Sequence, residues 1–231
     1  MLALKLGKSL TSSRNAPWLP SDESSLEGWF RKATNIQISG APPSISVSGW
    51  QDMSNNGHNM VQLTESEMPT FPLERTGDVI FDASATQSLE SASVISLSGQ
   101  FTIGIILQPL GVGVSVLGSN TLGGEFVKVQ SSTVLRVKID GSQVDLSVDS
   151  GTLVEQSYLV VTRNASNLIT LHKNGVAQAD TETLAGTADI DTIGVRKTDL
   201  NPFDGNIREV QFYSSTSAAL TANVNDRLAA L

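Results

Sequence analysis

The sequence predicts an all-β protein, an antiparallel β-sandwich that ends in a short helix. Val, Ile, Thr and Ser are abundant, and these residues suit strands and their turns. From Gln100 onward apolar and polar residues alternate, with turn dipeptides between the runs. Short strands at this spacing are typical of sandwiches and barrels. No helical stretch alternates with the strands, which excludes a parallel α/β fold.

Residues 1–20 are predicted to form an extended arm that precedes the domain. Leu2, Leu4 and Leu6 alternate with their neighbours as in a strand. These leucines and Trp18 are candidate partner-binding residues, because they would stay poorly covered unless they paired with a sheet edge or docked on a partner. The alternative is that the leucines complete the domain's own sheet.

The next segment, 21–33, fits two structures. Ser21 could cap a helix, with two acidic residues in its first turn. Gly28 weakens that interpretation, and the sequence around Trp29 could equally form a strand.

Strands are predicted over much of the chain beyond Gln100. Two dipeptides, Asp140-Gly141 and Asn174-Gly175, indicate tight turns because both tolerate positive φ. The predicted strands are 101–107, 112–118, 124–130, 133–140, 143–148, 157–163, 167–173, 189–195 and 205–214.

The end of the chain changes to a helical period over 217–231. The apolar positions are Leu220, Val224, Leu228 and Leu231. Ser217 suits the N-cap, and Arg227 suits the negative end of the helix dipole. We expect this helix to pack on the sandwich or close one end, with partner binding as the alternative. Residues 21–231 then form one domain.

The composition excludes several classes of protein. The formal charge is −8, and residues 33–127 carry one basic residue, Arg75, against eight acidic ones. A nucleic-acid-binding surface needs clustered Lys and Arg, which are missing. The chain has no Cys, so thiolate metal sites and disulfides are excluded. No apolar run approaches the roughly 20 residues that span a bilayer, and the start is not a convincing signal peptide.

Three stretches read together carry a family resemblance. They are Trp50–Met60 (WQDMSNNGHNM), Gly77–Ala83 (GDVIFDA), and a series from His172-Lys173-Asn174-Gly175 through Ile193-Gly194 to Phe203–Val210 (FDGNIREV). Their order and spacing resemble the laminin-G-like, concanavalin A-like domains. The resemblance covers about 26–214 and implies a concanavalin A-like jelly roll. Asn55 and Ala83 stand where that pattern usually has Gly.

The recurring residues are expected to have structural roles. Trp50, Phe81 and Phe203 are expected to be core residues. Asp52, Ser54 and Asn56 are expected to close an Asx- or Ser-type turn around Gly57, and Gly205 to supply a backbone angle that other residues resist.

Catalysis is not expected. Glucanases of related sandwich folds place paired carboxylates on one strand as Glu-x-Asp-x-Glu, and none of the ten glutamates has Asp two positions later. Glu65 and Glu67 lie in a polar loop. His58 is expected to bond to backbone inside its turn, and His172 to be an exposed strand residue, so a Ser-His-Asp triad is not expected either.

A calcium site is the one candidate metal site, and it rests on the resemblance. Laminin-G-like domains often hold calcium at the sandwich rim, and calcium takes six to eight oxygen ligands. The weak candidates are Asp189, Asp191, Asp199 and Asp204. The alternative is a solvated acidic rim without metal.

Three segments are also similar to virion structural proteins of tailed phages of marine cyanobacteria and related bacteria, namely MLALKLGKSL at the start, SDESSLEGWFR from Ser21, and NPFDGNIREVQFYSSTSAALTANVNDRL from Asn201. That resemblance implies a non-catalytic protein on the particle surface, made in the host cytoplasm. The first expectation is a capsid decoration protein that docks on the major capsid protein through residues 1–20, with self-association possible. The alternative is a tail-fibre or baseplate carbohydrate-binding module for host glycans. Nucleic-acid binding and membrane insertion are not expected.

Overall fold

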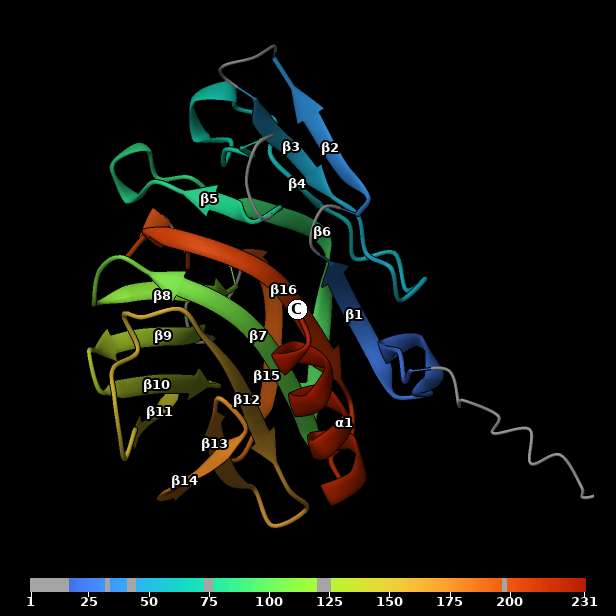
Figure 1. The fold of residues 1–231 in the computed structure, drawn as a ribbon, viewed down its shortest axis with the longest axis vertical. Coiled ribbons are helices and arrows are strands. Elements are labelled where there is room, and N and C mark those ends of the chain that lie inside the picture. The colour runs from blue at the N-terminus through green and yellow to red at the C-terminus, as the bar shows by residue number, and fades with distance from the viewer. Residues whose placement is uncertain (1–16, 32–33, 41–44, 73–76, 120–125, 197–198) are drawn as a thin grey trace, which may run out of the picture.

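Two antiparallel sheets stack face to face in the computed structural model of the chain, which describes residues 17–31, 34–40, 45–72, 77–119, 126–196 and 199–231 (Figure 1). The predicted all-β sandwich with a C-terminal helix is confirmed. Three short 3-10 turns complete the described structure, namely η1 (Pro20–Asp22), η2 (Glu65–Glu67) and η3 (Ala83–Ala85). Within those ranges, no helix is both long and apolar enough to cross a membrane.

The first sheet has seven strands in the order β1-β16-β7-β12-β13-β14, and β5 pairs with β16. Every pairing is antiparallel. The bounds are β1 Leu26–Arg31, β5 Val79–Phe81, β7 Phe101–Pro109, β12 Ser157–Arg163, β13 Leu168–Lys173, β14 Val176–Thr183 and β16 Gly205–Tyr213.

The second sheet has nine strands in the order β11-β10-β9-β8-β15-β6-β4-β3-β2. Its bounds are β2 Ile36–Ser39, β3 Ser46–Trp50, β4 Met60–Val61, β6 Leu89–Ser98, β8 Val114–Gly118, β9 Phe126–Ser131, β10 Val134–Ile139, β11 Ser142–Ser147 and β15 Thr187–Ile193.

The main core lies between the two sheets. Trp50 and Phe203 are fully buried and Phe81 is 1% exposed, so the three predicted core aromatics are confirmed. Phe81 and Phe203 meet edge to face with ring centroids 5.9 Å apart. The Trp50 indole N–H donates to the Arg31 carbonyl at 3.0 Å, which satisfies its polar atom inside the core.

Local backbone geometry confirms the predicted turns. Asn174 and Gly175 have φ of 50° and 80°, the left-handed region that a tight hairpin requires. Gly205 has φ of 140°, and a Cβ there would lie 2.2 Å from the Gln108 carbonyl oxygen. Only glycine therefore allows β16 to start so close to β7.

The predicted turn after Trp50 is also present. Asp52 accepts the backbone N–H of Ser54 at 2.8 Å, and the Ser54 hydroxyl accepts the N–H of Asn56 at 3.2 Å. The Asn56 amide donates to the Leu26 carbonyl at 2.9 Å. The turn is thereby tied to β1. Around Trp29 the strand interpretation is confirmed over Leu26–Arg31, whereas Ser21 lies in the 3-10 turn η1.

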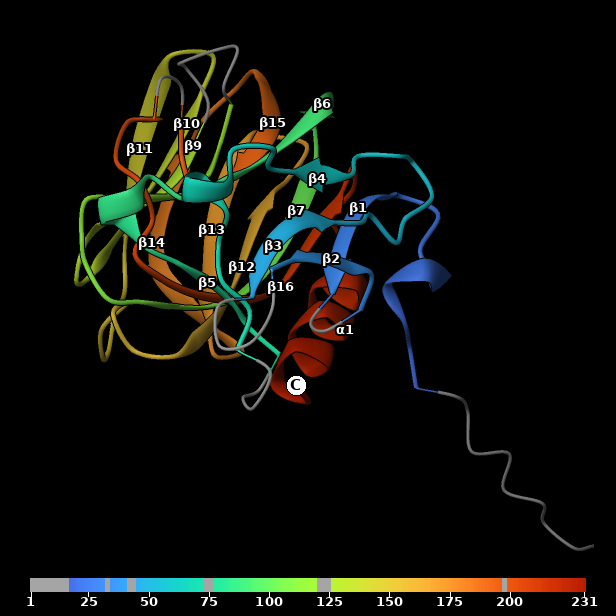
Figure 2. The same ribbon diagram turned by 90° about the horizontal axis from the view of Figure 1, so that it is seen from above.

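A second, smaller core lies on the outer face of the seven-stranded sheet. The helix α1 (Ala218–Ala229) packs there over β7 and β12 (Figure 2). Its apolar face is the predicted one, with Leu220, Val224 and Leu228 all buried. The Ser217 hydroxyl accepts the Leu220 N–H at 3.0 Å and so caps the helix as predicted. Gly104 of β7 gives α1 room, since a Cβ there would lie 2.7 Å from Val224 Cγ1.

Candidate functional site

A hollow of about 530 Å³ opens where α1 lies against the outer face of β12 and β13. Two rings, small side chains and polar groups line it. The lining residues are Tyr158, His172, Gly175, Ala218, Thr221, Ala222, Asn225 and Asp226. We call this hollow the near hollow.

Tyr158 stands at the start of β12 and is half-buried. The Asn174 side chain accepts its backbone N–H at 3.0 Å, which fixes this end of the strand beside the β13–β14 turn. A Cβ at position 175 would lie 3.1 Å from the phenol oxygen, so a side chain there would crowd it. Burial raises the pKa of Tyr158, and the negative charge of Asp226 adds to the effect.

His172 lies on β13, on the face that α1 covers. The prediction that it is exposed is wrong, because the side chain is half-buried in the near hollow. This burial lowers the pKa of its imidazole. The ring is therefore neutral near pH 7 and offers one donor and one acceptor.

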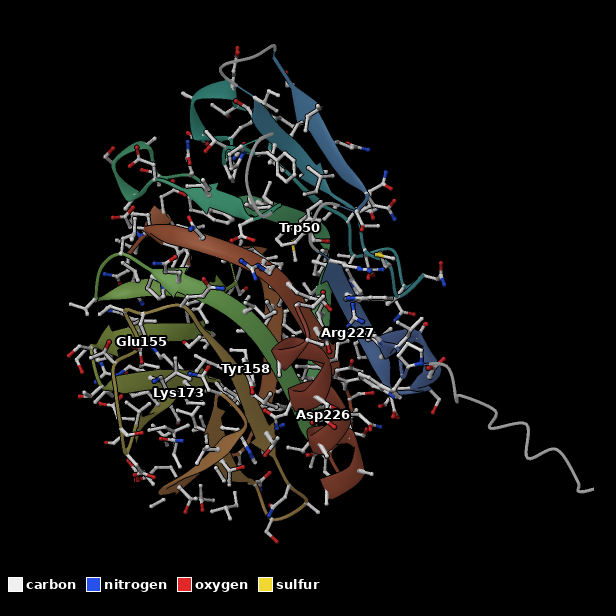
Figure 3. The ribbon with its side chains drawn as sticks, in the orientation of Figure 1. Trp50, Glu155, Tyr158, Lys173, Asp226 and Arg227 are labelled. Carbon is white, nitrogen blue, oxygen red and sulfur yellow. The ribbon has the colours of Figure 1, made fainter. Side chains whose placement is uncertain are left out.

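Asn225 and Asp226 enter the near hollow from α1. Asn225 is 8% exposed. Its amide nitrogen donates to the Thr221 carbonyl at 2.9 Å, and its Oδ1 is buried without a hydrogen-bond partner in the part of the chain that the structure describes. Asp226 is exposed, and Figure 3 shows it on α1 near Tyr158. An amide side chain and a carboxylate thus line the same hollow as the two rings.

A buried polar network holds α1 in this position. Glu209 of β16 accepts the Arg227 Nε–H and the Trp29 indole N–H, both at 2.9 Å. The Gln211 amide donates to the same carboxylate at 2.7 Å. The Arg227 guanidinium also lies 5.1 Å from the centre of the Trp29 ring. Arg227 was expected to serve the helix dipole, and it also joins the helix to the sheet.

The predicted partner-binding residues fall into two groups. Leu2, Leu4 and Leu6 lie outside the described residues. Trp18 was expected to be exposed, and that expectation is wrong. Its ring is half-buried against Tyr213, with centroids 6.5 Å apart, and its N–H donates to Glu23 at 3.2 Å. Trp18 packs on its own domain.

The four calcium candidates do not meet at one point. Asp189 bonds to the Ser96 hydroxyl, and Asp191 is buried near Ser119, whose hydroxyl lies 3.3 Å from its carboxylate. Across the described ranges no three His, Cys, Asp or Glu residues form a group that could hold a metal ion. Asp199 is exposed and Asp204 is half-buried.

His58, Glu65 and Glu67, which were considered above as catalytic candidates, lie outside the near hollow. His58 has its Nδ1 3.0 Å from the Ser93 hydroxyl oxygen and 3.4 Å from the Ser93 carbonyl oxygen. Glu65 and Glu67 form part of η2. Neither group lines the near hollow, whose lining includes a single carboxylate, that of Asp226, among the described residues.

Sequence reasoning missed the near hollow. Tyr158 stood in a predicted strand and Asn225 and Asp226 in a predicted helix, but no local pattern joins β12, β13 and α1. The signal that could have been used is the pair of polar residues, Asn225 and Asp226, beside the apolar face of the predicted helix.

No family model and no curated protein sequence matches the chain. Solved structures match it in fold. The binding domain of Paraclostridial Mosquitocidal Protein 1 is 14% identical, with a TM-score of 0.53, over 91% of this chain and 53% of that one. The receptor binding domain of botulinum neurotoxin mosaic serotype C/D is 11% identical, with a TM-score of 0.61, over 90% of this chain and 52% of that one.

The third match is domain 4 of AbnA, a GH43 extracellular arabinanase from Geobacillus stearothermophilus, in complex with arabinotriose. It is 13% identical, with a TM-score of 0.54, over 87% of this chain and 98% of that one. The chain spans about half the length of the two toxin domains. These likenesses identify the class of fold, a concanavalin-like β-sandwich.

Proposed function

We propose that the chain is a non-catalytic carbohydrate-binding module and that the near hollow is its glycan site. One observation carries the proposal. The half-buried Tyr158 and His172 rings, the Asn225 side chain and the exposed Asp226 carboxylate line one hollow. Binding sites typically combine an apolar or aromatic wall with a few polar groups that fix orientation.

The chemistry of these groups fits a sugar. A sugar ring has a flat C–H face that can lie on an aromatic ring and a rim of hydroxyls that donate and accept. Tyr158 offers the ring, and Asp226 accepts from hydroxyls with the strength of a charge-assisted bond. His172 in the same hollow offers one further donor and one acceptor to those hydroxyls.

The number of carboxylates in the near hollow favours binding without catalysis. Glycoside hydrolysis ordinarily uses two carboxyl groups that flank the bond. Asp226 is the single carboxylate among the described residues that line the near hollow. Glu209 is fully buried in its hydrogen-bond network on the sheet. The matched AbnA domain, which was solved with arabinotriose, supports carbohydrate as the ligand class.

The test is glycan binding by the purified full chain and two matched variants. Ala222 and Ala219 are both exposed on α1, but only Ala222 lines the near hollow. We expect the wild-type chain and Ala219→Trp to bind the same glycans on an array, and Ala222→Trp to lose them. Tyr158→Ala should weaken binding by about 2 kcal/mol, roughly 30-fold, as for a central aromatic contact. Equal binding by both Trp variants would place the site elsewhere.

We also propose, from the resemblance to tailed-phage virion proteins, that the module is displayed on a particle surface through the arm of residues 1–20. Leu2, Leu4 and Leu6 are the candidate docking residues. The first location that we propose is the capsid surface, where the chain would be a decoration protein. The alternative is the tail or baseplate, which the proposed glycan site favours.

A truncation tests the docking role, and the structure fixes where to cut. Because Trp18 packs on Tyr213, the truncated protein should begin at Pro17 rather than after residue 20. We expect it to fold with unchanged thermal stability and to be absent from purified particles. Full occupancy of the truncated protein on particles would disprove docking through the arm.

A further inference from the structure

A second hollow of about 430 Å³ adjoins the near hollow along α1. Ala218 and Thr221 line both. On β13 the outward residue Thr170 belongs to the second hollow, and His172, two positions on, belongs to the near hollow. We call the second space the far hollow. The two hollows share Ala218 and Thr221 and so lie side by side between the helix and β13, and we call the pair the groove.

The groove is longer than a single sugar ring. Leu168 lines the far hollow and His172 the near hollow, and at about 3.3 Å per residue their Cα atoms lie about 13 Å apart along β13. The far hollow extends beyond Leu168 to Ala165 and Ser166 in the turn before β13. A ligand that fills both hollows is therefore elongated.

The far hollow is lined by hydroxyls and amides and by no charged side chain among the described residues. Gln100, Asn164 and Ser166 lie at its rim, and the Thr162 and Thr170 hydroxyls lie 2.6 Å apart on its floor. These groups can donate to and accept from the hydroxyls of a sugar. Tyr158 and His172, the two rings, stand in the near hollow.

The one charged side chain in the described lining of the groove is negative. Asp226 is the single charged residue in the described lining of both hollows, and the chain carries a formal charge of −8. An anionic sugar would meet this carboxylate with no Lys or Arg in that lining to offset it, and like charges brought together oppose binding. A neutral sugar can use the same carboxylate as a hydrogen-bond acceptor.

We propose that the groove binds a neutral, elongated oligosaccharide, with one sugar ring against Tyr158 and the units that follow along the hydroxyl-lined far hollow. This inference rests on the proposed function and specifies its ligand class. It predicts a dependence of affinity on chain length, which a single-ring site would lack, and discrimination against sugars that carry a carboxylate.

The experiment measures affinity by titration calorimetry with the full chain. The probes are arabino-, xylo-, cello- and malto-oligosaccharides from single sugars to hexamers, with sialyllactose and oligogalacturonates as the anionic counterparts. Ala165→Trp obstructs the far hollow without removing a side-chain hydrogen bond, because Ala165 is an exposed turn residue. Ala222→Trp obstructs the near hollow.

We expect at least one neutral series to gain about tenfold or more, about 1.4 kcal/mol, between single sugar and hexamer. Ala165→Trp should abolish that gain and leave the affinity for the shortest bound sugar unchanged, whereas Ala222→Trp should abolish both. Asp226→Asn should narrow the preference for neutral over anionic chains.

The outcomes separate the two proposals. If the affinity for neutral sugars did not depend on chain length, or if Ala165→Trp did not change it, the proposal of an elongated ligand would be overturned. The proposed glycan site in the near hollow would still stand. Anionic chains that bind more tightly than neutral ones would overturn the charge selection alone. Failure of every probe to bind would overturn the proposed function and this inference with it.

Discussion

The Arg227 guanidinium and the Glu209 carboxylate meet at 2.9 Å between α1 and β16, with side-chain exposures of 9% and 0%. This ion pair joins the helix that forms one wall of the groove to a strand of the sheet that forms its floor. Because both groups are withdrawn from water, each depends on the other for its stability.

Removal of one partner should therefore be costly. Arg227→Met leaves the Glu209 carboxylate buried with only its neutral donors, and we expect a loss of about 3 kcal/mol in the free energy of unfolding. The matched control is Arg136→Met, because Arg136 pairs with Asp145 at 2.6 Å on an exposed surface, where such pairs are worth about 0–1 kcal/mol. Urea denaturation measures both, and equal losses would contradict the buried pair's importance.

Helix docking depends on the close approach of Gly104 and Val224. Gly104→Ala places a methyl group 2.7 Å from Val224 Cγ1, and overpacking of this kind costs about 1–3 kcal/mol. Val224→Ala removes the opposing methyls. In a double-mutant cycle measured by thermal or urea unfolding, we expect Gly104→Ala to cost less in the Val224→Ala background. Strictly additive losses would show that the two positions do not interact.

The stability of the fold should depend on pH through His172. Its pKa is lowered in the folded state by burial, so the unfolded chain binds a proton more readily than the folded one. Stability is then complete above the unfolded pKa of about 6.5 and falls as pH drops from there toward the folded pKa. Urea midpoints between pH 7.5 and 5 should fall less steeply in His172→Gln. An NMR titration midpoint of His172 above its value in denaturant would contradict this sign.

The N-cap of α1 provides a further test of helix stability. Ser217→Ala removes the acceptor of the Leu220 N–H and should cost about 1 kcal/mol. Ser217→Asp retains an acceptor and adds a favourable charge at the positive helix end, so its unfolding free energy should match or exceed that of the wild type. A loss with Asp as large as that with Ala would exclude capping as the cause.

A strand is easiest to predict from sequence where its two faces differ. In β10 the inward Leu135, Val137 and Ile139 alternate with two cations, and 133–140 was predicted nearly to the residue. In contrast, β14 reads VAQADTET and is mostly exposed, and β6 carries many Ser. Neither strand alternates apolar and polar residues along its whole length. The positions of these strands follow from pairing with other strands, some of them distant in sequence.

The ambiguity at β1 has a physical origin. Trp29 and Phe30 are both buried on opposite faces, because α1 covers the outer face of the sheet, and a bulge between Leu26 and Gly28 interrupts the register. The groove was unpredictable for a related reason. Tyr158 and Asp226 come together only because α1 returns across β12, and no local pattern specifies that return.

The position of β16 has a consequence for how the chain folds. This strand is the last in sequence, yet it lies between β1 and β7, and β1 has no other neighbour in its sheet among the described strands. During synthesis, about 180 further residues must therefore be added after Leu26–Arg31 before its partner strand is made. Strand pairings of such long range are slow to form. Residues 205–231 close the seven-stranded sheet and cover its outer face, so we expect nascent chains that lack them to expose β1, β7 and β12 to aggregation.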